Sequence, residues 1–195
     1  CVNRQDTFFE TPSLLEWLPD ETFFSLVSRH HRLWGHSVAR RTAEQLFGHL
    51  QGGAHHDLPS YLGQYVIRTG GVHGSAQTLA LEHTLLKYYS AFMQPIDVIN
   101  AVAVMASKNV AHLKLKLGIL TSRFRANHPL KACEACIADD AHTQGWAYWH
   151  LEHQYPGLWV CLKHAQVLRE SVFKSTGVER FQWHSPFTDC LRPWP

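Results

Sequence analysis

The sequence predicts a mainly α-helical protein that carries a small zinc-binding β-hairpin module. Apolar residues recur at helical spacing in several segments between residues 20 and 128. Turns rich in Gly, each followed by Asp or Ser, separate these segments. A CxxC pair and a CxxH pair, with 24 residues between them, then lie within residues 129–170. These observations indicate a helical domain followed by a zinc-finger module.

The composition is that of a globular protein. Of the 195 residues, 45% are hydrophobic and 17% are charged, and the sequence has no apolar run of the roughly 18 residues that a membrane span needs. The formal charge is only +2, so the overall charge does not by itself indicate a nucleic-acid partner. Five cysteines without a secretion signal favour a reduced, cytoplasmic protein over a disulfide framework. The termini leave open whether the chain is a short protein or the N-terminal portion of a longer one.

The helical domain is expected over residues 20–128, after an extended N-terminal arm formed by residues 1–19. Asp20 is a suitable N-cap for the first helix, because its carboxylate can accept the unpaired amides of the first turn. Gly35 can end that helix, and Ser37 can cap a second one. The arm and the first two helices are therefore separated by recognisable capping residues.

Two further helices follow from the same signals. Asp57 can cap a helix that extends to about Arg68, and Ser75 can cap the segment AQTLALEHTL. Two pairs of helices joined by short Gly turns are compatible with helix-turn-helix packing. The same pattern is equally compatible with an ordinary helical bundle, so both remain open.

A long helix is predicted from Pro95 to about Gly118, with an apolar first half and a basic second half. Between Asp97 and Glu134 the sequence has six Lys or Arg and no acidic residue. Such a stretch can follow a phosphate backbone, although a solvated helix face has the same composition. The candidate DNA contacts are the basic residues of this stretch and of the region around the first inter-helix turn: Lys108, Lys114, Lys116, Arg123, Arg125, Arg29, Arg32, Arg40 and Arg41.

The spaced cysteines predict a structural zinc site. Zinc in such sites takes four converging ligands, and each short pair supplies two of them. The predicted ligands are Cys133, Cys136, Cys161 and His164. The segment GWAYWHLEHQYPGLWV favours short strands around a Pro-Gly turn, so a hairpin is expected to join the two pairs.

The same region of the sequence allows alternatives to a closed zinc site. His150 and His153 compete as ligands but are more typical of polar residues on a strand face. No thioredoxin-like strand and helix surround the CxxC, which disfavours a redox pair. A zinc hydrolase or nuclease needs an open metal position or a carboxylate cluster, and the sequence indicates neither, so we predict no enzyme. The aromatic residues Trp146, Trp149 and Trp159 are candidates either for partner contacts or for the core of the module.

Several segments, in the same order, resemble the TniQ family, which includes the transposition protein TnsD. They are LPDETFFSLVSRHHRLWG, LPSYLG, LEHTLLKYYSAFM, SRFRANHPLKACEAC and WVCLKHAQVL. Together they cover about residues 15–170. The chain departs from the family at His153, eight residues before the third ligand, where members often have Trp. Residues 171–195 are expected to form a C-terminal tail or the start of a further region.

The resemblance implies a non-catalytic adaptor that selects the insertion site of a transposon. It implies binding to target DNA, to a CRISPR effector complex with its guide RNA, or to another TniQ copy. It also implies recruitment of an AAA+ ATPase regulator (TnsC/TniB-like), which brings the transposase. A bacterial, nucleoid-associated location in the cytoplasm is the corresponding expectation. The alternative is a zinc-dependent protein–protein adaptor, or a DNA-binding regulator, without a direct role in transposition.

Overall fold

The computed structural model describes residues 13–108, 110–117, 129–173 and 182–193. Their helices are α1 (Phe23–Leu33), α2 (Ala39–Phe47), α3 (Leu62–Arg68), α4 (Ala76–His83), α5 (Leu86–Ser90), α6 (Pro95–Ala106), α7 (Ala111–Lys116) and α8 (Glu134–Thr143), with 3₁₀ turns η1 (Glu152–Gln154) and η3 (Thr188–Cys190). Strands β1 (Lys131–Ala132) and β2 (Arg169–Glu170) form a two-stranded antiparallel sheet. The mainly helical fold class with a small sheet is confirmed.

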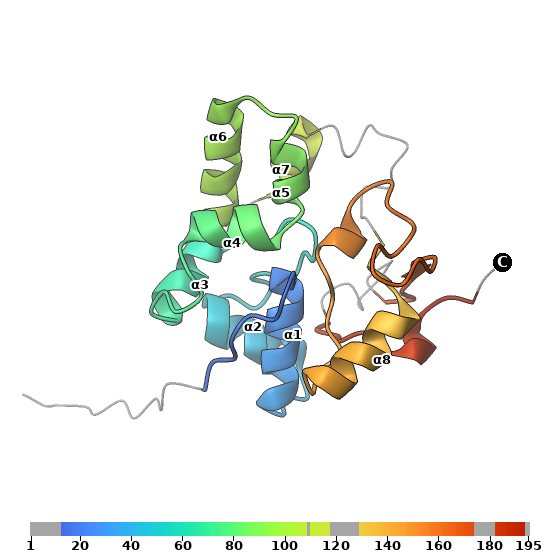
Figure 1. Cartoon of the computed structure of the whole chain (residues 1–195). Helices are drawn as coiled ribbons and strands as arrows, with labels where there is room; N and C mark the ends of the chain where they lie inside the picture. Colours follow the sequence, from blue (N-terminus) through green and yellow to red (C-terminus); the bar gives the residue numbers. More distant parts are fainter. Residues whose placement is uncertain (1–12, 109, 118–128, 174–181, 194–195) are drawn as a thin grey trace, which may run out of the picture.

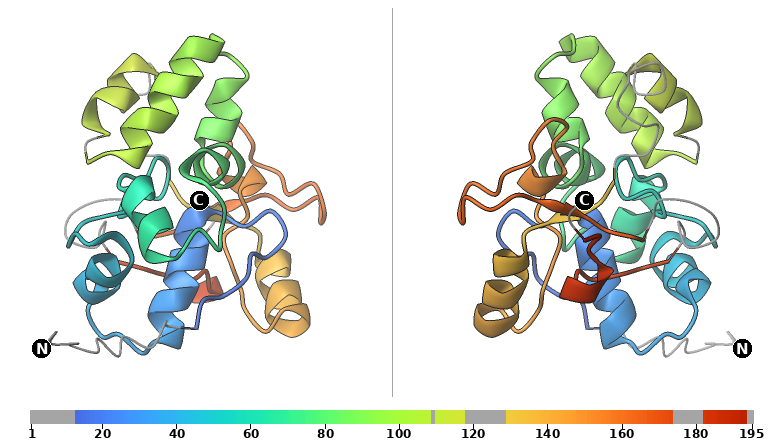
Figure 2. Two further views of the ribbon diagram at one scale, coloured as in Figure 1. Left: turned by 90° about the vertical axis from the view of Figure 1, so that its left-hand side faces the viewer. Right: turned by 90° about the vertical axis from the view of Figure 1, so that its right-hand side faces the viewer.

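Helices α1 to α7 form one group, and α8 lies beside α1 with the C-terminal segments (Figures 1 and 2). Helices α5, α6 and α7 are at the top of Figure 1, and α1 and α2 are at the bottom. Consecutive pairs α1 with α2 and α3 with α4 are in contact. No helix within the described ranges is long and apolar enough to cross a membrane.

The beginning of α1 differs from the prediction. Thr22, and not Asp20, is the N-cap, and its side chain accepts a hydrogen bond of 3.1 Å from the Ser25 amide. The Asp20 carboxylate instead accepts the Glu152 amide at 2.9 Å, and its carbonyl accepts the Leu151 amide at 2.7 Å. Asp20 therefore ties the N-terminal segment to the second half of the chain, a long-range role that local capping rules do not reveal.

Of the other predicted caps, one is confirmed and two are wrong. The Ser75 side chain accepts the Thr78 amide at 3.1 Å and caps α4. Ser37 caps nothing, because α2 follows Val38 without a side-chain cap. Helix α3 begins only after Tyr61, while Asp57 is engaged in a buried ion pair. Asp57 therefore forms a tertiary ion pair with Lys114 in place of the predicted cap.

The long helix predicted from Pro95 is interrupted after Ala106, so α6 and α7 are separate elements. Ser107 adopts an extended conformation, and its carbonyl accepts the Tyr61 amide at 2.8 Å. Beyond the break, Val110 and Leu113 are buried against the core of α1 to α6. The bend lets α7 pack against the helical group. The burial of these apolar side chains outweighs the propensity of the segment to continue as one helix.

One apolar core joins the two halves of the chain. It contains Phe23, Phe47 and Tyr65 from the helical group and Trp149 and Trp183 from the C-terminal half. A second, much smaller cluster consists of the three ligand cysteines and Leu168. The segment with the predicted metal ligands thus packs onto the helical core but has little apolar interior of its own.

The predicted hairpin between the ligand pairs is wrong in position. The paired strands β1 and β2 lie outside the ligands and enclose both pairs. The segment between α8 and η1 (residues 144–151) instead runs beside the start of α1. Glu21 forms an isolated bridge with His150, and the Trp149 amide donates to Ser25 Oγ at 3.0 Å. Burial of the Trp149 ring in the main core holds the linker in this path and prevents a separate aromatic hairpin.

Candidate metal centre

The two ligand pairs come from two short backbone motifs. Cys133 is the residue immediately before α8, and Cys136 lies in the first turn of that helix. Cys161 and His164 lie in a tight turn, in which the Ala165 amide donates to the Cys161 carbonyl at 2.8 Å. Ala165 has a φ of 52°, which closes this turn. The CxxC and CxxH spacings therefore place two ligands each on one side of their turns.

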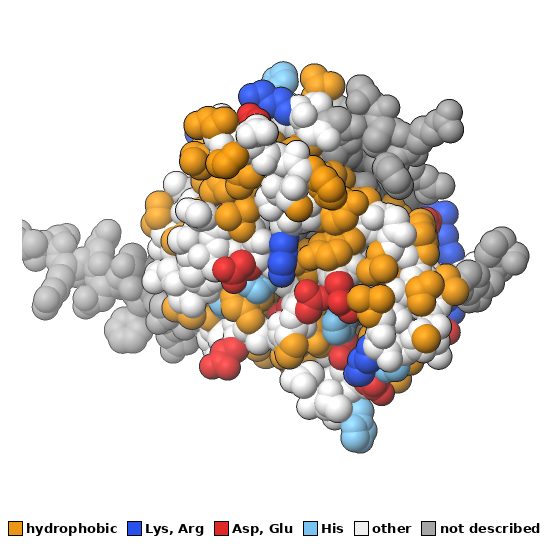
Figure 3. Space-filling model, turned by 45° about the horizontal axis from the view of Figure 1, so that its top comes forward, with side chains coloured by type: hydrophobic (Ala, Val, Ile, Leu, Met, Phe, Trp, Pro, Cys, Tyr) orange, Lys and Arg blue, Asp and Glu red, His pale blue; other side chains and the backbone are white. Residues whose placement is uncertain are grey.

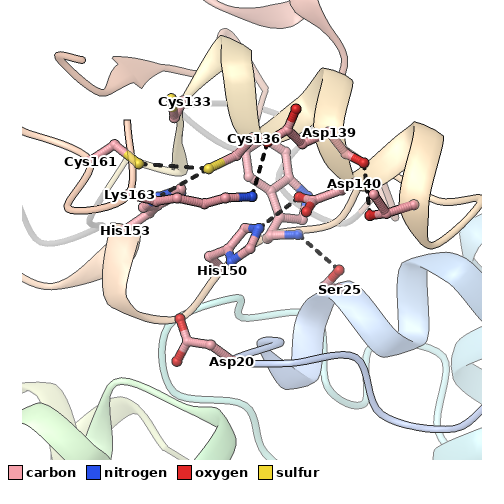
Figure 4. Close-up of polar contacts among 12 residues, drawn as sticks. Asp20, Ser25, Cys133, Cys136, Asp139, Asp140, His150, His153, Cys161 and Lys163 are labelled. Atoms are coloured by element: carbon pink, nitrogen blue, oxygen red, sulfur yellow. Dashed lines mark hydrogen bonds and ion pairs between the residues drawn. The ribbon is translucent and has the colours of Figure 1, made fainter. Parts of the chain in front are cut away.

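The structure brings all four predicted ligands together, and Figure 4 shows the three cysteines among them. Their ligand atoms lie within 4.8 Å of one another. The sulfurs of Cys136 and Cys161 are 3.6 Å apart, and His164 Nδ1 is 3.3 Å from Cys136 Sγ and 3.7 Å from each of the other two sulfurs. Tetrahedral zinc bonds of about 2.3 Å to sulfur and 2.0 Å to nitrogen put ligand atoms roughly 3.5–3.8 Å apart. The cluster therefore fits Zn²⁺.

The thiol chemistry agrees with a bound cation. Burial raises the pKa of Cys136, and the adjacent Cys161 sulfur raises it further. Burial also raises the pKa of Cys133, although the backbone amides of Cys136 and Ala135 oppose that shift. Several buried thiolates cannot coexist at this distance without a positive charge between them. Zinc would supply that charge and displace the thiol protons as it binds.

Asp139 orients the histidine ligand, a role that the sequence analysis missed. His164 Nε2 donates to Asp139 Oδ2 at 3.0 Å, which leaves Nδ1 unprotonated toward the sulfurs. Lys163 Nζ donates to the same oxygen at 3.0 Å, and these two partners lower the pKa of Asp139. A carboxylate behind a ligating imidazole is common in metal sites. The sequence does contain an indication of this role, because Asp139 follows Cys136 by three residues and therefore lies on the same side of α8.

The competing histidines are outside the four-ligand group. His153 is 1% exposed, and burial, followed by the nearby His150, lowers its pKa to about 3. His150 Nε2 lies 2.7 Å from Asp140 Oδ2, and its ring stacks on Tyr148. No other group of three or more metal-ligating residues occurs within the parts of the chain that the structure describes.

Two of the candidate DNA contacts are unavailable. Arg29 is buried and donates to both carboxylate oxygens of Glu21, at 2.7 and 2.6 Å, and to the Glu16 carbonyl. Lys114 is also buried, with Nζ 2.6 Å from Asp57 Oδ2. Because these cations already have partners inside the protein, neither side chain is available as a phosphate contact, and both predictions are wrong.

The remaining basic candidates differ in position. Those exposed in the described structure are Arg32, Arg40, Arg41, Lys108 and Lys116. Arg32 lies over the Trp146 ring, 5.6 Å from its centroid. Arg123 and Arg125 lie outside the described residues. Lys131, the sixth cation of the acid-free stretch, is buried and donates to two carbonyls. The basic stretch therefore offers fewer phosphate contacts than its composition suggests.

The three candidate aromatic contacts also differ in how exposed their side chains are. Trp149 is fully buried, and its indole donates to the His184 carbonyl at 2.6 Å. Trp146 is half-buried beneath Arg32. Trp159 is 45% exposed, and Lys131 Nζ lies 4.7 Å from the centroid of its ring. Trp159 is therefore the residue of this set that a partner could contact most directly.

Comparison with known protein families gives a match over most of the chain. A family model described as TniQ matches residues 12–168 of the 195-residue chain. No curated protein matches the chain. The matched range includes the helical group and all four residues of the metal cluster. The chain therefore belongs to the TniQ family.

Proposed function

We propose that this protein is a non-catalytic adaptor that selects target sites in DNA transposition. In this role it binds target DNA, or an effector already bound to DNA through a guide RNA, and recruits an AAA+ ATPase regulator and then the transposase. The observation that supports it best is the TniQ match over residues 12–168, since the family is one of non-catalytic transposition adaptors. We expect it to act at the bacterial nucleoid.

The ligand set supports a structural role for the metal. Three cysteines and one histidine complete a tetrahedral shell, so no position is left for a reactive water. Zinc bound there would supply folding free energy by cross-linking α8 to the turn at Cys161 and His164. Asp139 would hold the imidazole in the ligating tautomer. These residues thus stabilise a surface and provide no reaction centre.

Direct DNA contact is best tested through two pairs of exposed cations. Arg40 and Arg41 lie on α2, whereas Lys108 lies in the connection between α6 and α7 and Lys116 is the last residue of α7. Anisotropy titrations of duplex DNA over a salt series would give the number of phosphate contacts. Each contact removed by Ala should reduce the salt slope by about 0.9.

The control for these titrations is Lys87→Ala, which changes an exposed cation of α5 outside the candidate set. The two variants to compare replace Arg40 and Arg41, or Lys108 and Lys116, with Ala. An unchanged salt slope in both would exclude these four cations as phosphate contacts. Absence of binding by the parent at low salt would exclude direct DNA recognition. It would leave a DNA-bound effector as the target.

A protein–protein adaptor without DNA contact is the second candidate, and one observation favours it. Trp159, Val160, Leu162 and Val167 expose apolar side chains on the zinc-binding segment. Figure 3 shows hydrophobic side chains exposed on several parts of the surface. Trp159, Val167 and Pro193 also line a cavity of about 430 Å³. Exposed aromatic residues beside such cavities are effective anchors for partners.

A pull-down of the AAA+ ATPase, with and without DNA, separates the two candidates. Retention of the ATPase without DNA, and its loss in Trp159→Ala, would support the protein adaptor. Trp146→Ala is the matched control, because that ring is half-buried beneath Arg32. Retention that requires DNA, and that Trp159→Ala leaves unchanged, would favour target selection through DNA.

A further inference from the structure

His153 is a buried histidine that the ligand spacing does not explain. It belongs to the 3₁₀ turn η1 and is 1% exposed. Its Nε2 lies 3.9 Å from Cys136 Sγ, and its Nδ1 is buried without a hydrogen-bond partner (Figure 4). A polar ring held in the interior against a ligand sulfur indicates an interaction with that sulfur.

The geometry argues against His153 as a metal ligand. The four ligand atoms of Cys133, Cys136, Cys161 and His164 already lie within 4.8 Å of one another, and His153 is not in that group. A tetrahedral zinc ion has no fifth position in a structural site. The ring is therefore placed behind the Cys136 sulfur, as a neighbour of the ligand and not of the ion.

The charge of a loaded site explains why such a neighbour is needed. Zn²⁺ with three thiolates and a neutral imidazole retains one negative charge, here surrounded by buried residues. Hydrogen-bond donors to the sulfurs stabilise that charge. Gln166 faces Cys133 Sγ with its side-chain oxygen at 3.7 Å, which is an acceptor and gives the sulfur no donor. For Cys136, the side chain outside the ligand set that can place a donor against the sulfur is His153.

The position of the two ring nitrogens selects one tautomer. A proton on Nδ1 would leave a buried N–H without an acceptor, which is unfavourable. A proton on Nε2 points toward the Cys136 sulfur, and an unpaired Nδ1 lone pair is the smaller penalty. The environment therefore favours a neutral ring that carries its proton on Nε2.

We propose that His153 donates an Nε2–H hydrogen bond to the Cys136 thiolate of the metal-loaded site. His153 is thus a positioning residue that lowers the reactivity of the sulfur and slows loss of the metal. This inference rests on the proposed metal site.

Cobalt substitution of the full chain provides the test. Co²⁺ bound to thiolates gives sulfur-to-metal charge-transfer bands, and a hydrogen bond to sulfur raises their energy by stabilising the sulfur lone pairs. His153→Phe keeps a ring but removes the donor, whereas His153→Gln can return an N–H close to the position of Nε2. The matched control is His142→Phe, an exposed histidine near the end of α8.

The Phe variant should shift the charge-transfer bands to lower energy and weaken cobalt affinity by about tenfold. It should also accelerate alkylation of the metal-loaded cysteines by N-ethylmaleimide. The Gln variant should restore most of each change, and the His142 control should match the parent. A folded Phe variant with unchanged bands and alkylation rate would overturn the proposal, as would a Gln variant no better than Phe.

Nitrogen NMR of the zinc-loaded parent tests the same bond without any substitution. His153 should appear as the neutral tautomer protonated at Nε2. A proton on Nδ1, or a doubly protonated ring, would overturn the proposal even if the Phe variant does not fold. A parent that binds neither cobalt nor zinc would overturn the metal site together with this inference. A loaded parent with the wrong tautomer would overturn only the role of His153.

Discussion

Helices α1 to α7 contribute most of a large cluster of apolar side chains, whereas the segment that carries the predicted metal ligands, residues 129–170, has Leu168 and three cysteines as a second cluster. Full burial of one large apolar side chain contributes about 1.5–3 kcal/mol, so the helical group has ample apolar stabilisation. We expect that segment to depend instead on the proposed metal cross-link and on Trp149, which packs in the helical core. The difference indicates that metal removal and core mutations should act on different parts of the molecule.

Removal of the metal should have the largest effect and is the most direct way to break this comparison. Chelation, or Cys161→Ser, should abolish hydrogen-exchange protection in α8 while α3 to α6 retain theirs. Metal binding in zinc-finger peptides is worth about 10–16 kcal/mol, far more than one apolar contact. Cys190→Ser is the control, because Cys190 is buried but is not among the four ligands. Retained protection in α8 after chelation would contradict a structural role for zinc.

Removal of Trp149 should weaken the connection between the two regions. Trp149→Ala creates a cavity in the shared core, and the expected loss is about 3–5 kcal/mol in the free energy of unfolding. Urea titrations followed by circular dichroism would measure it. Trp159→Ala, at a side chain 45% exposed, should cost less than about 1 kcal/mol. Equal losses in the two variants would show that the zinc-binding segment does not depend on the core contact.

The buried pair of Asp57 and Lys114 tests whether the helical group also depends on charge. Lys114→Met leaves the Asp57 carboxylate buried without its cation and should cost about 3–5 kcal/mol. Burial alone would raise the pKa of Asp57, but Lys114 and then His56 outweigh burial and hold the pKa below its usual range.

The stability that the pair contributes is therefore complete above the ordinary carboxyl pKa and is lost as the pH falls through the lowered pKa. Urea midpoints measured from neutral pH to about pH 2 should fall more steeply for the parent than for Asp57→Asn. Equal slopes would show that Asp57 does not contribute to acid sensitivity.

The smallest predicted effect concerns helix capping within the helical group. Ser75→Ala removes the side chain that accepts the Thr78 amide and should cost about 1 kcal/mol. Ser37→Ala should cost almost nothing, because α2 has no side-chain cap. Thermal unfolding of the two variants in parallel would measure the difference. A larger loss for Ser37→Ala would restore the cap that the sequence predicted.

Local sequence patterns by themselves determined the ligand set, the helical fold class and the cap at Ser75. A CxxC or CxxH pair converges because its residues are three apart along the chain, so geometry follows from spacing. The Ser75 cap likewise involves an amide only three residues away. Interactions of this range need no knowledge of the rest of the fold.

Tertiary structure alone decided which polar residues are buried and paired inside the protein. Asp57 and Lys114 look like a cap and a phosphate contact, yet they pair across a distance of 57 positions in the sequence. The linker around Trp149 has the residues of a hairpin but follows α1, because its ring fills the shared core. His153 acquires a role only because η1 brings it against Cys136. Burial makes unpaired charges and polar groups costly, and the partners that satisfy them are selected by the packed fold and not by neighbouring residues.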